Sequence, residues 1–166
     1  LAARGLDARS PAPSMRPWLL ALALPALAVA CERPVYLSFD TGHMGVAEQV
    51  AATLDKHQVP ATFFLASEPT LAGGHSLDEH WAPFWRRLAA SGRHDFGSHT
   101  WAHDIWVADL ADGAMRFRTQ AGRQAPSWRR LDAAAYCAEL RRVDARFQQM
   151  TGRALDPLFR APAGKT

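Results

Sequence analysis

The sequence predicts an α/β fold built from parallel βαβ units, arranged as a sheet or a barrel. Strand-like apolar runs alternate four times with amphipathic helical patterns, which is typical of parallel strands joined by right-handed crossovers. The 166 residues, 48% hydrophobic and 21% charged, have the composition of a single globular domain. Asp40, His99 and Arg160 each fall at the carboxyl end of a predicted strand, where working groups lie in this architecture.

The first two predicted strands flank a helix. Residues 34–39 form a β-branched and aromatic run that ends at the turn-forming Asp-Thr-Gly of residues 40–42, which indicates a buried strand. Residues 45–58 carry Val46, Val50 and Leu54 at helical spacing. Residues 59–65 (Val-Pro-Ala-Thr-Phe-Phe-Leu) predict the second strand, with a proline only where a strand tolerates one, at its start.

A second helix and a short strand follow. Residues 79–91 place four large apolar side chains on one helical face and are followed by Gly92, a residue typical of helix ends. Residues 95–98 (Asp-Phe-Gly-Ser) predict a third strand that leads directly into His99.

The remaining chain predicts a long loop, one strong helix and a last strand. Between residues 104 and 130 the periodicity is lost, so we expect a long surface loop or insertion on the rim near the histidines. Asp132 is positioned to cap a helix that Gly152 ends. Its apolar residues recur every three or four positions, and residues 157–160 (Pro-Leu-Phe-Arg) predict a fourth strand.

The domain is expected to span residues 31–166 and to be incomplete at its carboxyl end. Four βα units do not close a barrel, which typically needs about 200 residues or more. Residues 15–30 have the basic start, apolar middle and small-residue end of a secretory signal peptide, preceded by an unstructured upstream segment at residues 1–14. We therefore expect export to the periplasm or the exterior, with no stable membrane span after cleavage. Cys31 leaves a lipid anchor open as an alternative.

The charge pattern does not indicate a nucleic-acid partner. The net charge is +3, and five arginines fall between residues 116 and 130. No nucleic-acid motif or interleaved aromatic pattern accompanies them, so a solvated basic loop is the better interpretation.

Two histidines give the strongest indication of chemistry. His99 and His103 are four residues apart, and on one helical turn their imidazoles would face the same way, close enough to share a Zn²⁺-type ion. With Asp40 and Arg160 expected at the same rim, this set indicates a metal-dependent hydrolase. A zinc peptidase is disfavoured, because Thr100 stands where that mechanism needs a glutamate.

With these motifs in place, residues 34–164 resemble the polysaccharide deacetylases of carbohydrate esterase family 4, the NodB-homology domain. Ser-Phe-Asp-Thr-Gly at 38–42 resembles the family motif Thr-Phe-Asp-Asp-Gly. His-Thr-Trp-Ala-His at 99–103 matches His-Ser/Thr-x-x-His, and Arg-Ala-Pro-Ala-Gly at 160–164 matches Arg-x-Pro-x-Gly.

The resemblance implies a (β/α) barrel, of which this chain would hold the N-terminal part. It implies hydrolysis of carbon–nitrogen, non-peptide bonds that removes acetyl groups from a polysaccharide or amino-sugar glycan. By resemblance Asp40 is the catalytic base, Arg160 orients it, and His99 and His103 bind a divalent metal. Zinc is the expected ion, with cobalt, nickel or manganese as alternatives. The backbone N–H of Ala163 would stabilise the oxyanion.

Two further residues, Trp101 and Pro162, are expected to contact the glycan, Trp101 by stacking on a sugar ring.

One position departs from the family pattern: Thr41 stands where the family has its second aspartate, a metal ligand. Three outcomes are open. His43 or a water completes the metal shell, or Asp40 becomes a ligand while another group acts as base, or affinity is low and activity is lost. The last outcome would make the protein a non-catalytic carbohydrate-binding or envelope protein.

Overall fold

The structure, a computed structural model, describes residues 33–120 and 127–164. The chain divides into two units, residues 1–34 and 35–166, and the fold described below is that of the second. The predicted upstream segment, the signal peptide and Cys31 lie outside the described residues. Within the described ranges, no helix combines the length and the apolar character needed to cross a membrane.

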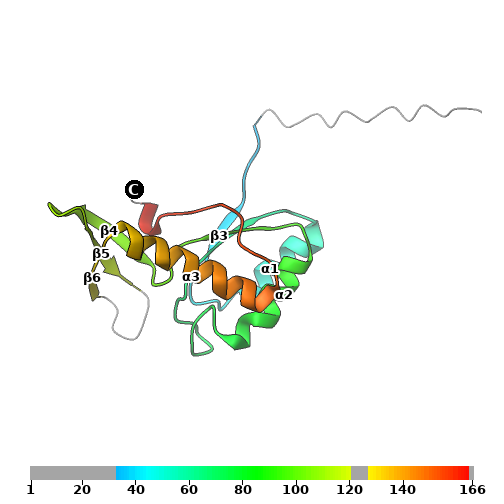
Figure 1. The fold of residues 1–166 in the computed structure, drawn as a ribbon. Helices are drawn as coiled ribbons and strands as arrows, with labels where there is room; N and C mark the ends of the chain where they lie inside the picture. Colours follow the sequence, from blue (N-terminus) through cyan, green and yellow to red (C-terminus); the bar gives the residue numbers. More distant parts are fainter. Residues whose placement is uncertain (1–32, 121–126, 165–166) are drawn as a thin grey trace, which may run out of the picture. The chain divides into compact units, whose positions relative to one another are not determined.

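A parallel three-stranded sheet forms the centre of the domain (Figure 1). Its strands are β1 (Ser38–Asp40), β2 (Thr62–Leu65) and β3 (Asp95–Ser98), hydrogen-bonded in that order. The helix α1 (Ala47–His57) connects β1 to β2. A short 3-10 turn, η1 (Glu79–Trp81), and the helix α2 (Ala82–Ala90) connect β2 to β3. The structure therefore confirms the first three predicted strands and the two helices between them, and β1 begins four residues later than predicted.

The core lies between this sheet and the helices, and aromatic rings dominate it. Phe63 of β2 stacks on Phe39 and on Phe96, with ring centroids 5.5 and 5.8 Å apart. Phe147 of the last helix packs against Phe96 with ring centroids 4.8 Å apart, and Trp85 of α2 meets Phe63 edge-on. Burying each such side chain contributes about 1.5–3 kcal/mol, so these contacts hold the three strands in register.

The long helix α3 (Ala133–Thr151) begins and ends where the sequence predicts. The Asp132 carboxylate accepts a hydrogen bond from the Ala135 N–H at 2.8 Å, which satisfies one of the free donors of the first turn. Gly152 adopts φ 77°, a left-handed conformation that ends helices and that glycine adopts without strain. Val143, Phe147 and Met150 are buried, so the second half of the helix carries the core face.

The prediction of a long loop between residues 104 and 130 is wrong. This segment forms an antiparallel sheet of β4 (Asp104–Asp109), β5 (Met115–Thr119) and β6 (Ser127–Leu131), in that order. The sequence signal that was missed is the alternation of buried and exposed residues that is typical of a strand. Phe117 and Thr119 are buried, whereas Arg118 between them is exposed. Asp-Gly at 112–113, with Gly113 at φ 79°, is the turn that joins β4 to β5.

The fourth predicted strand is present only as an isolated parallel bridge between Ser98 and Phe159. The Ser98 N–H donates to the Leu158 carbonyl, and the Arg160 N–H donates to the Ser98 carbonyl. The segment therefore lies along β3 without forming a full strand, and a 3-10 turn, η2 (Pro162–Gly164), follows it. In the described residues the parallel sheet is open, so the structure shows an α/β sheet rather than a closed barrel.

Candidate active site

The carboxyl ends of the parallel strands bring Asp40 and Arg160 together across the sheet. The Arg160 guanidinium donates to the Asp40 carboxylate at 2.7 Å and to the Ser38 hydroxyl at 2.6 Å. It crosses the face of the Phe64 ring, with 4.1 Å from its central carbon to the ring centroid. Hydrogen bonds to two β1 residues and stacking on β2 fix the guanidinium, which in turn orients the carboxylate.

His99 follows β3 and is buried, with only 2% of its surface exposed. Its Nδ1 lies 2.7 Å from the Arg160 carbonyl oxygen, so Nδ1 carries the proton and donates it there. The other ring nitrogen, Nε2, lies 3.8 Å from the Asp40 carboxylate. A carbonyl that fixes the imidazole tautomer in this way leaves Nε2 with a free lone pair facing the carboxylate, the arrangement typical of metal-binding histidines.

His103 lies beside His99, but not on a helical turn as predicted. The two ring centroids are 4.8 Å apart and the rings meet edge to face. Thr100 and His103 have φ values of 62° and 52°, which no right-handed helix contains, so an irregular turn brings the rings together. Left-handed backbone at non-glycine residues is strained, and such residues concentrate at functional sites.

Both imidazoles are held in the neutral form that binds metals. Burial lowers the pKa of His99 and of His103, and the neighbouring His99 lowers the pKa of His103 further. The Nδ1 atom of His103 is buried without a hydrogen-bond partner among the described residues. Two neutral imidazoles with available nitrogens beside a carboxylate fit a zinc-type ion. The part of the chain that the structure describes holds no group of three or more His, Cys, Asp or Glu side chains arranged as a metal site.

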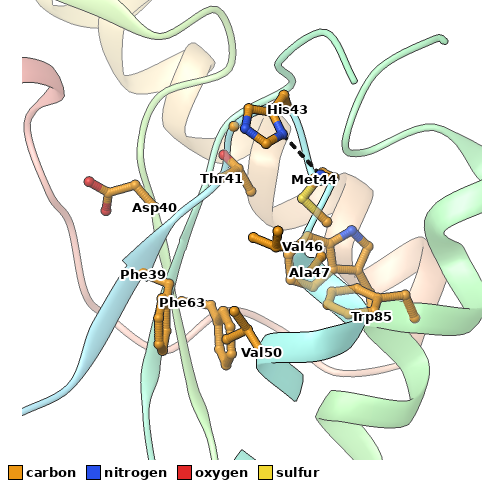
Figure 2. Close-up of a pocket in the computed structure, with 13 residues that line it drawn as sticks. Phe39, Asp40, Thr41, His43, Met44, Val46, Ala47, Val50, Phe63 and Trp85 are labelled. Carbon is orange, nitrogen blue, oxygen red and sulfur yellow. Dashed lines mark hydrogen bonds between the residues drawn. The ribbon is translucent and has the colours of Figure 1, made fainter. Parts of the chain in front are cut away.

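Thr41, which stands where the family has a metal-binding aspartate, does not offer its hydroxyl as a third metal ligand. Its hydroxyl accepts a hydrogen bond from the Ala66 N–H at 2.8 Å and lies 2.8 Å from the Glu68 carboxylate, to which it donates. The hydroxyl is thus committed to the chain that follows β2. His43 does not join the imidazole pair: its exposed ring accepts a hydrogen bond from the Gly45 N–H at 3.0 Å. Figure 2 shows the Asp40 carboxylate pointing away from the His43 ring.

Glu68 is a residue at this rim that the sequence analysis missed. It follows β2, just as Asp40 ends β1 and His99 follows β3. Burial raises the pKa of its carboxyl to about 7, with the nearby charge of Asp40 also raising it and the Thr41 hydrogen bond lowering it. The signal in the sequence was its place three residues beyond β2 on the same edge of the sheet.

The remaining predicted site residues lie around this group. Arg142 stacks its guanidinium on the Trp101 ring at 3.9 Å, and Trp101 packs against the core. Pro162 is buried in η2, and Ala163 has φ 58°. A role for these three residues in binding substrate or an oxyanion stays a prediction.

Asp104 ties the histidine turn to the antiparallel sheet. It is fully buried, and its backbone N–H donates to the Thr100 hydroxyl at 2.9 Å. Its carboxylate accepts from the Thr119 hydroxyl at 2.6 Å and from Arg129 at 2.7 Å. Burial raises the pKa of Asp104, and both of these bonds oppose that shift. The ion pair between the buried Asp104 carboxylate and the half-buried Arg129 therefore anchors the turn that carries His99 and His103.

An apolar cavity of about 210 Å³ lies on the α1 side of Asp40 (Figure 2). Phe39, Val50, Phe63 and Trp85 form much of its wall. Because converging polar groups are few, this cavity is a gap in the packing beside β1 rather than the place where the imidazoles and the carboxylate meet.

Several solved structures share this fold. A chitin deacetylase from the fungal pathogen Colletotrichum lindemuthianum is 24% identical, with a TM-score of 0.54 over 78% of this chain and 46% of its own. A family 4 carbohydrate esterase from Bacillus anthracis is 22% identical, with a TM-score of 0.51 over 78% of this chain and 48% of its own. A family 4 pseudoenzyme, also from Bacillus anthracis, is 15% identical, with a TM-score of 0.51 over 78% of this chain and 35% of its own.

The chain thus spans half the length or less of these structures. No curated protein matches the sequence. The family model described as polysaccharide deacetylase matches residues 29–166, a range that includes all three sequence motifs. On this match the chain belongs to the polysaccharide deacetylase family.

Proposed function

We propose that the protein is a metal-dependent hydrolase that removes acetyl groups from a polysaccharide or amino-sugar glycan. The observation that carries the proposal is the meeting of Asp40, Arg160, His99 and His103 at one rim of the sheet, from three separate parts of the chain. A divalent cation held by the two imidazoles would supply Lewis-acid chemistry, polarising the acetyl carbonyl and lowering the pKa of water.

The chain's own residues would position and deprotonate the attacking water. Asp40, fixed by Arg160, accepts the proton as the water oxygen bonds to the acetyl carbonyl carbon. The carbon–nitrogen bond then breaks, acetate leaves, and the proton ends on the amine nitrogen of the sugar. The Ala163 N–H is proposed to donate to the oxyanion formed in between.

Acetate release from a hexamer of N-acetylglucosamine, measured with and without added zinc, tests this function. Asp40→Asn should abolish release without unfolding the protein, because Asn keeps the shape and loses the base. Asp95→Asn is the matched control, since Asp95 is an exposed carboxylate at the opposite end of the parallel sheet. Equal acetate release by wild type and Asp40→Asn would contradict the proposal.

A non-catalytic carbohydrate-binding or envelope protein is the second candidate. It is supported by Thr41, whose hydroxyl is committed to Ala66 and Glu68, and by the existence of a pseudoenzyme among the similar structures. Zinc content separates the two: the hydrolase should bind about one ion per chain. A purified protein that stays metal-free at millimolar zinc and releases no acetate fits the second candidate.

We also propose that the protein acts outside the cytoplasm, released after signal cleavage or anchored through a lipid on Cys31. The pattern of residues 15–30 supports this proposal. The mass of the mature N-terminal peptide from expressing cells distinguishes a free Cys31, a lipidated one and an uncleaved chain.

A further inference from the structure

The antiparallel sheet of β4, β5 and β6 (Figure 1) has two faces of different character. On the inner face, Phe117 stacks on Tyr136 of α3 beside an aromatic cavity of about 420 Å³. The outer face carries four exposed side chains, which we call the arginine face: Arg116 and Arg118 of β5, and Trp128 and Arg130 of β6. The arginines that were expected in a solvated loop are therefore held on one side of a sheet.

The register of the strands gathers positive charge on this face. Arg116 of β5 lies directly opposite Arg130 of β6. On the other side of β5, the register partners of Arg116 and Arg118 are uncharged residues of β4, Ala108 and Ile105. Like charges that lie directly opposite each other destabilise a sheet. The pairing of two arginines therefore works against the stability of the fold, and an anionic ligand would give it a function.

The acidic residues of the domain neutralise only part of this charge. Arg130 forms an ion pair with Asp112 of the turn between β4 and β5. Arg129, which points to the inner face, pairs with two carboxylates. Within residues 33–120 and 127–164, no carboxylate pairs with Arg116 or Arg118. The guanidinium groups of these two residues are exposed, and their N–H donors can bind an anion.

Trp128 adds an aromatic ring among these charges. It is 66% exposed, although a side chain of that size is ordinarily mostly covered. The Arg116 guanidinium lies over the ring, with 5.5 Å from its central carbon to the ring centroid, and Arg118 is the register partner of Trp128. An indole has an apolar body and a polar N–H, and tryptophan is therefore enriched where lipid meets water.

A lipid surface with anionic headgroups has a partner for both kinds of side chain. Guanidinium groups bind phosphate through paired N–H donors, and each arginine close to an anionic membrane strengthens the attraction. The headgroup region also accepts an exposed indole, which a phosphate polymer dissolved in water does not cover. The arginine face therefore fits a membrane surface better than a soluble polyanion.

We propose that the arginine face is a docking surface for a membrane that contains anionic lipids. The arginines bind the headgroup phosphates, and the Trp128 ring lies at the level of the headgroups. This contact is peripheral and requires no membrane-spanning helix. It is also independent of the proposed hydrolase activity, because none of the four side chains belongs to the candidate active site.

Co-sedimentation with lipid vesicles tests the docking surface. The protein used begins at residue 31 and carries Cys31→Ser, so that neither the predicted signal peptide nor a lipid contributes. It should bind vesicles of phosphatidylglycerol and phosphatidylcholine in equal parts, dissociate as salt is added, and not bind phosphatidylcholine alone. Arg116→Gln/Arg118→Gln should weaken binding by at least about tenfold. Removing exposed like charges does not cost the fold, and circular dichroism verifies that this variant is folded.

Arg87→Gln/Arg141→Gln is the matched control. It removes the same net charge from exposed arginines of α2 and α3, outside the antiparallel sheet. Because salt screens charges that do not touch the membrane, the vesicle affinity should change by less than about twofold. Equal weakening by the two double variants would show that net charge alone drives the binding. That result, or vesicle binding that does not depend on phosphatidylglycerol, overturns the proposal.

Two further measurements distinguish a membrane from a soluble polyanion. Lipids brominated near the headgroup should quench part of the tryptophan fluorescence, and Trp128→Phe should remove that quenching, because the indole at the headgroups is lost. Quenching that Trp128→Phe leaves unchanged would place a different face on the lipid and refute the docking surface. Inorganic polyphosphate is the soluble probe. If polyphosphate binding requires Arg116 and Arg118 while vesicle binding does not, the arginine face belongs to a soluble polyanion and the membrane proposal fails.

Discussion

Replacing Glu68 by glutamine should make the protein more stable at neutral and alkaline pH and leave it unchanged in acid. Burial raises the pKa of this carboxyl from 4.5 to about 7 in the folded protein, so the folded state holds its proton over a range in which the unfolded state has lost it. Glu68 therefore stabilises the fold fully below pH 4.5, and that contribution is lost as pH rises to about 7. Glutamine is neutral at every pH and keeps an oxygen that can accept from Thr41.

The size of the effect follows from the shift. A raised pKa of this size corresponds to at most about 3 kcal/mol, and contact with solvent reduces it to about 1–2 kcal/mol. Urea unfolding followed by circular dichroism, at pH values from 4 to 8 and with a chelator present, measures the free energy of unfolding of both proteins. The difference between Glu68→Gln and wild type should be close to zero at pH 4 and reach about 1–2 kcal/mol at pH 8.

Glu79→Gln is the matched control, because Glu79 is an exposed carboxylate on η1. Its substitution should change stability by no more than about 0.5 kcal/mol at any of these pH values. If the curves of Glu68→Gln and wild type run parallel from pH 4 to 8, the carboxyl is not held protonated by the fold and the reasoning is refuted.

Two other substitutions test how the rim is built. Gly97→Ala would place a Cβ 2.7 Å from the Leu158 carbonyl oxygen and 2.8 Å from the Phe64 ring. The free energy of unfolding should therefore fall by about 1–3 kcal/mol. An unchanged denaturation midpoint would show that the segment leading to Arg160 does not need this close approach. Arg129→Met leaves the Asp104 carboxylate buried without its charge partner, and should cost about 3–5 kcal/mol. Arg129 also pairs with Glu139 at 2.8 Å, so the double variant Asp104→Asn/Arg129→Met should recover only the part of that loss that comes from Asp104 in the same unfolding assay. Equal instability of single and double variants would contradict the ion-pair argument.

Local patterns in the sequence predicted the parallel part of the fold. The run of residues 59–65, the spacing of Val50 and Leu54, and the capping pair Asp132 and Gly152 each specify an element through contacts within a few residues. The antiparallel sheet was missed because Arg116, Arg118 and Arg130 made its segment look like a solvated loop. Its strands are stabilised by pairing with each other, and a charged outward face does not prevent that pairing.

The sequence also predicted which side chains would meet, because parallel strands place their carboxyl ends at one edge. It did not predict how they meet. The turn from His99 to His103 is irregular rather than helical, and the bond from His99 to the Arg160 carbonyl joins residues 61 positions apart. Such bonds depend on which segment lies beside which, and that is not encoded in any local spacing.

The sequence by itself determined the α/β class, the three motifs and the family, since these depend on residue identity and short-range periodicity. Tertiary structure alone decided which groups the Thr41 hydroxyl binds, namely Ala66 and Glu68, which are 25 and 27 positions further along the chain. It also decided that an aromatic cavity forms where the antiparallel sheet faces α3. Both arise from packing between elements that are distant in the chain, where the available partners are fixed only once the fold has formed.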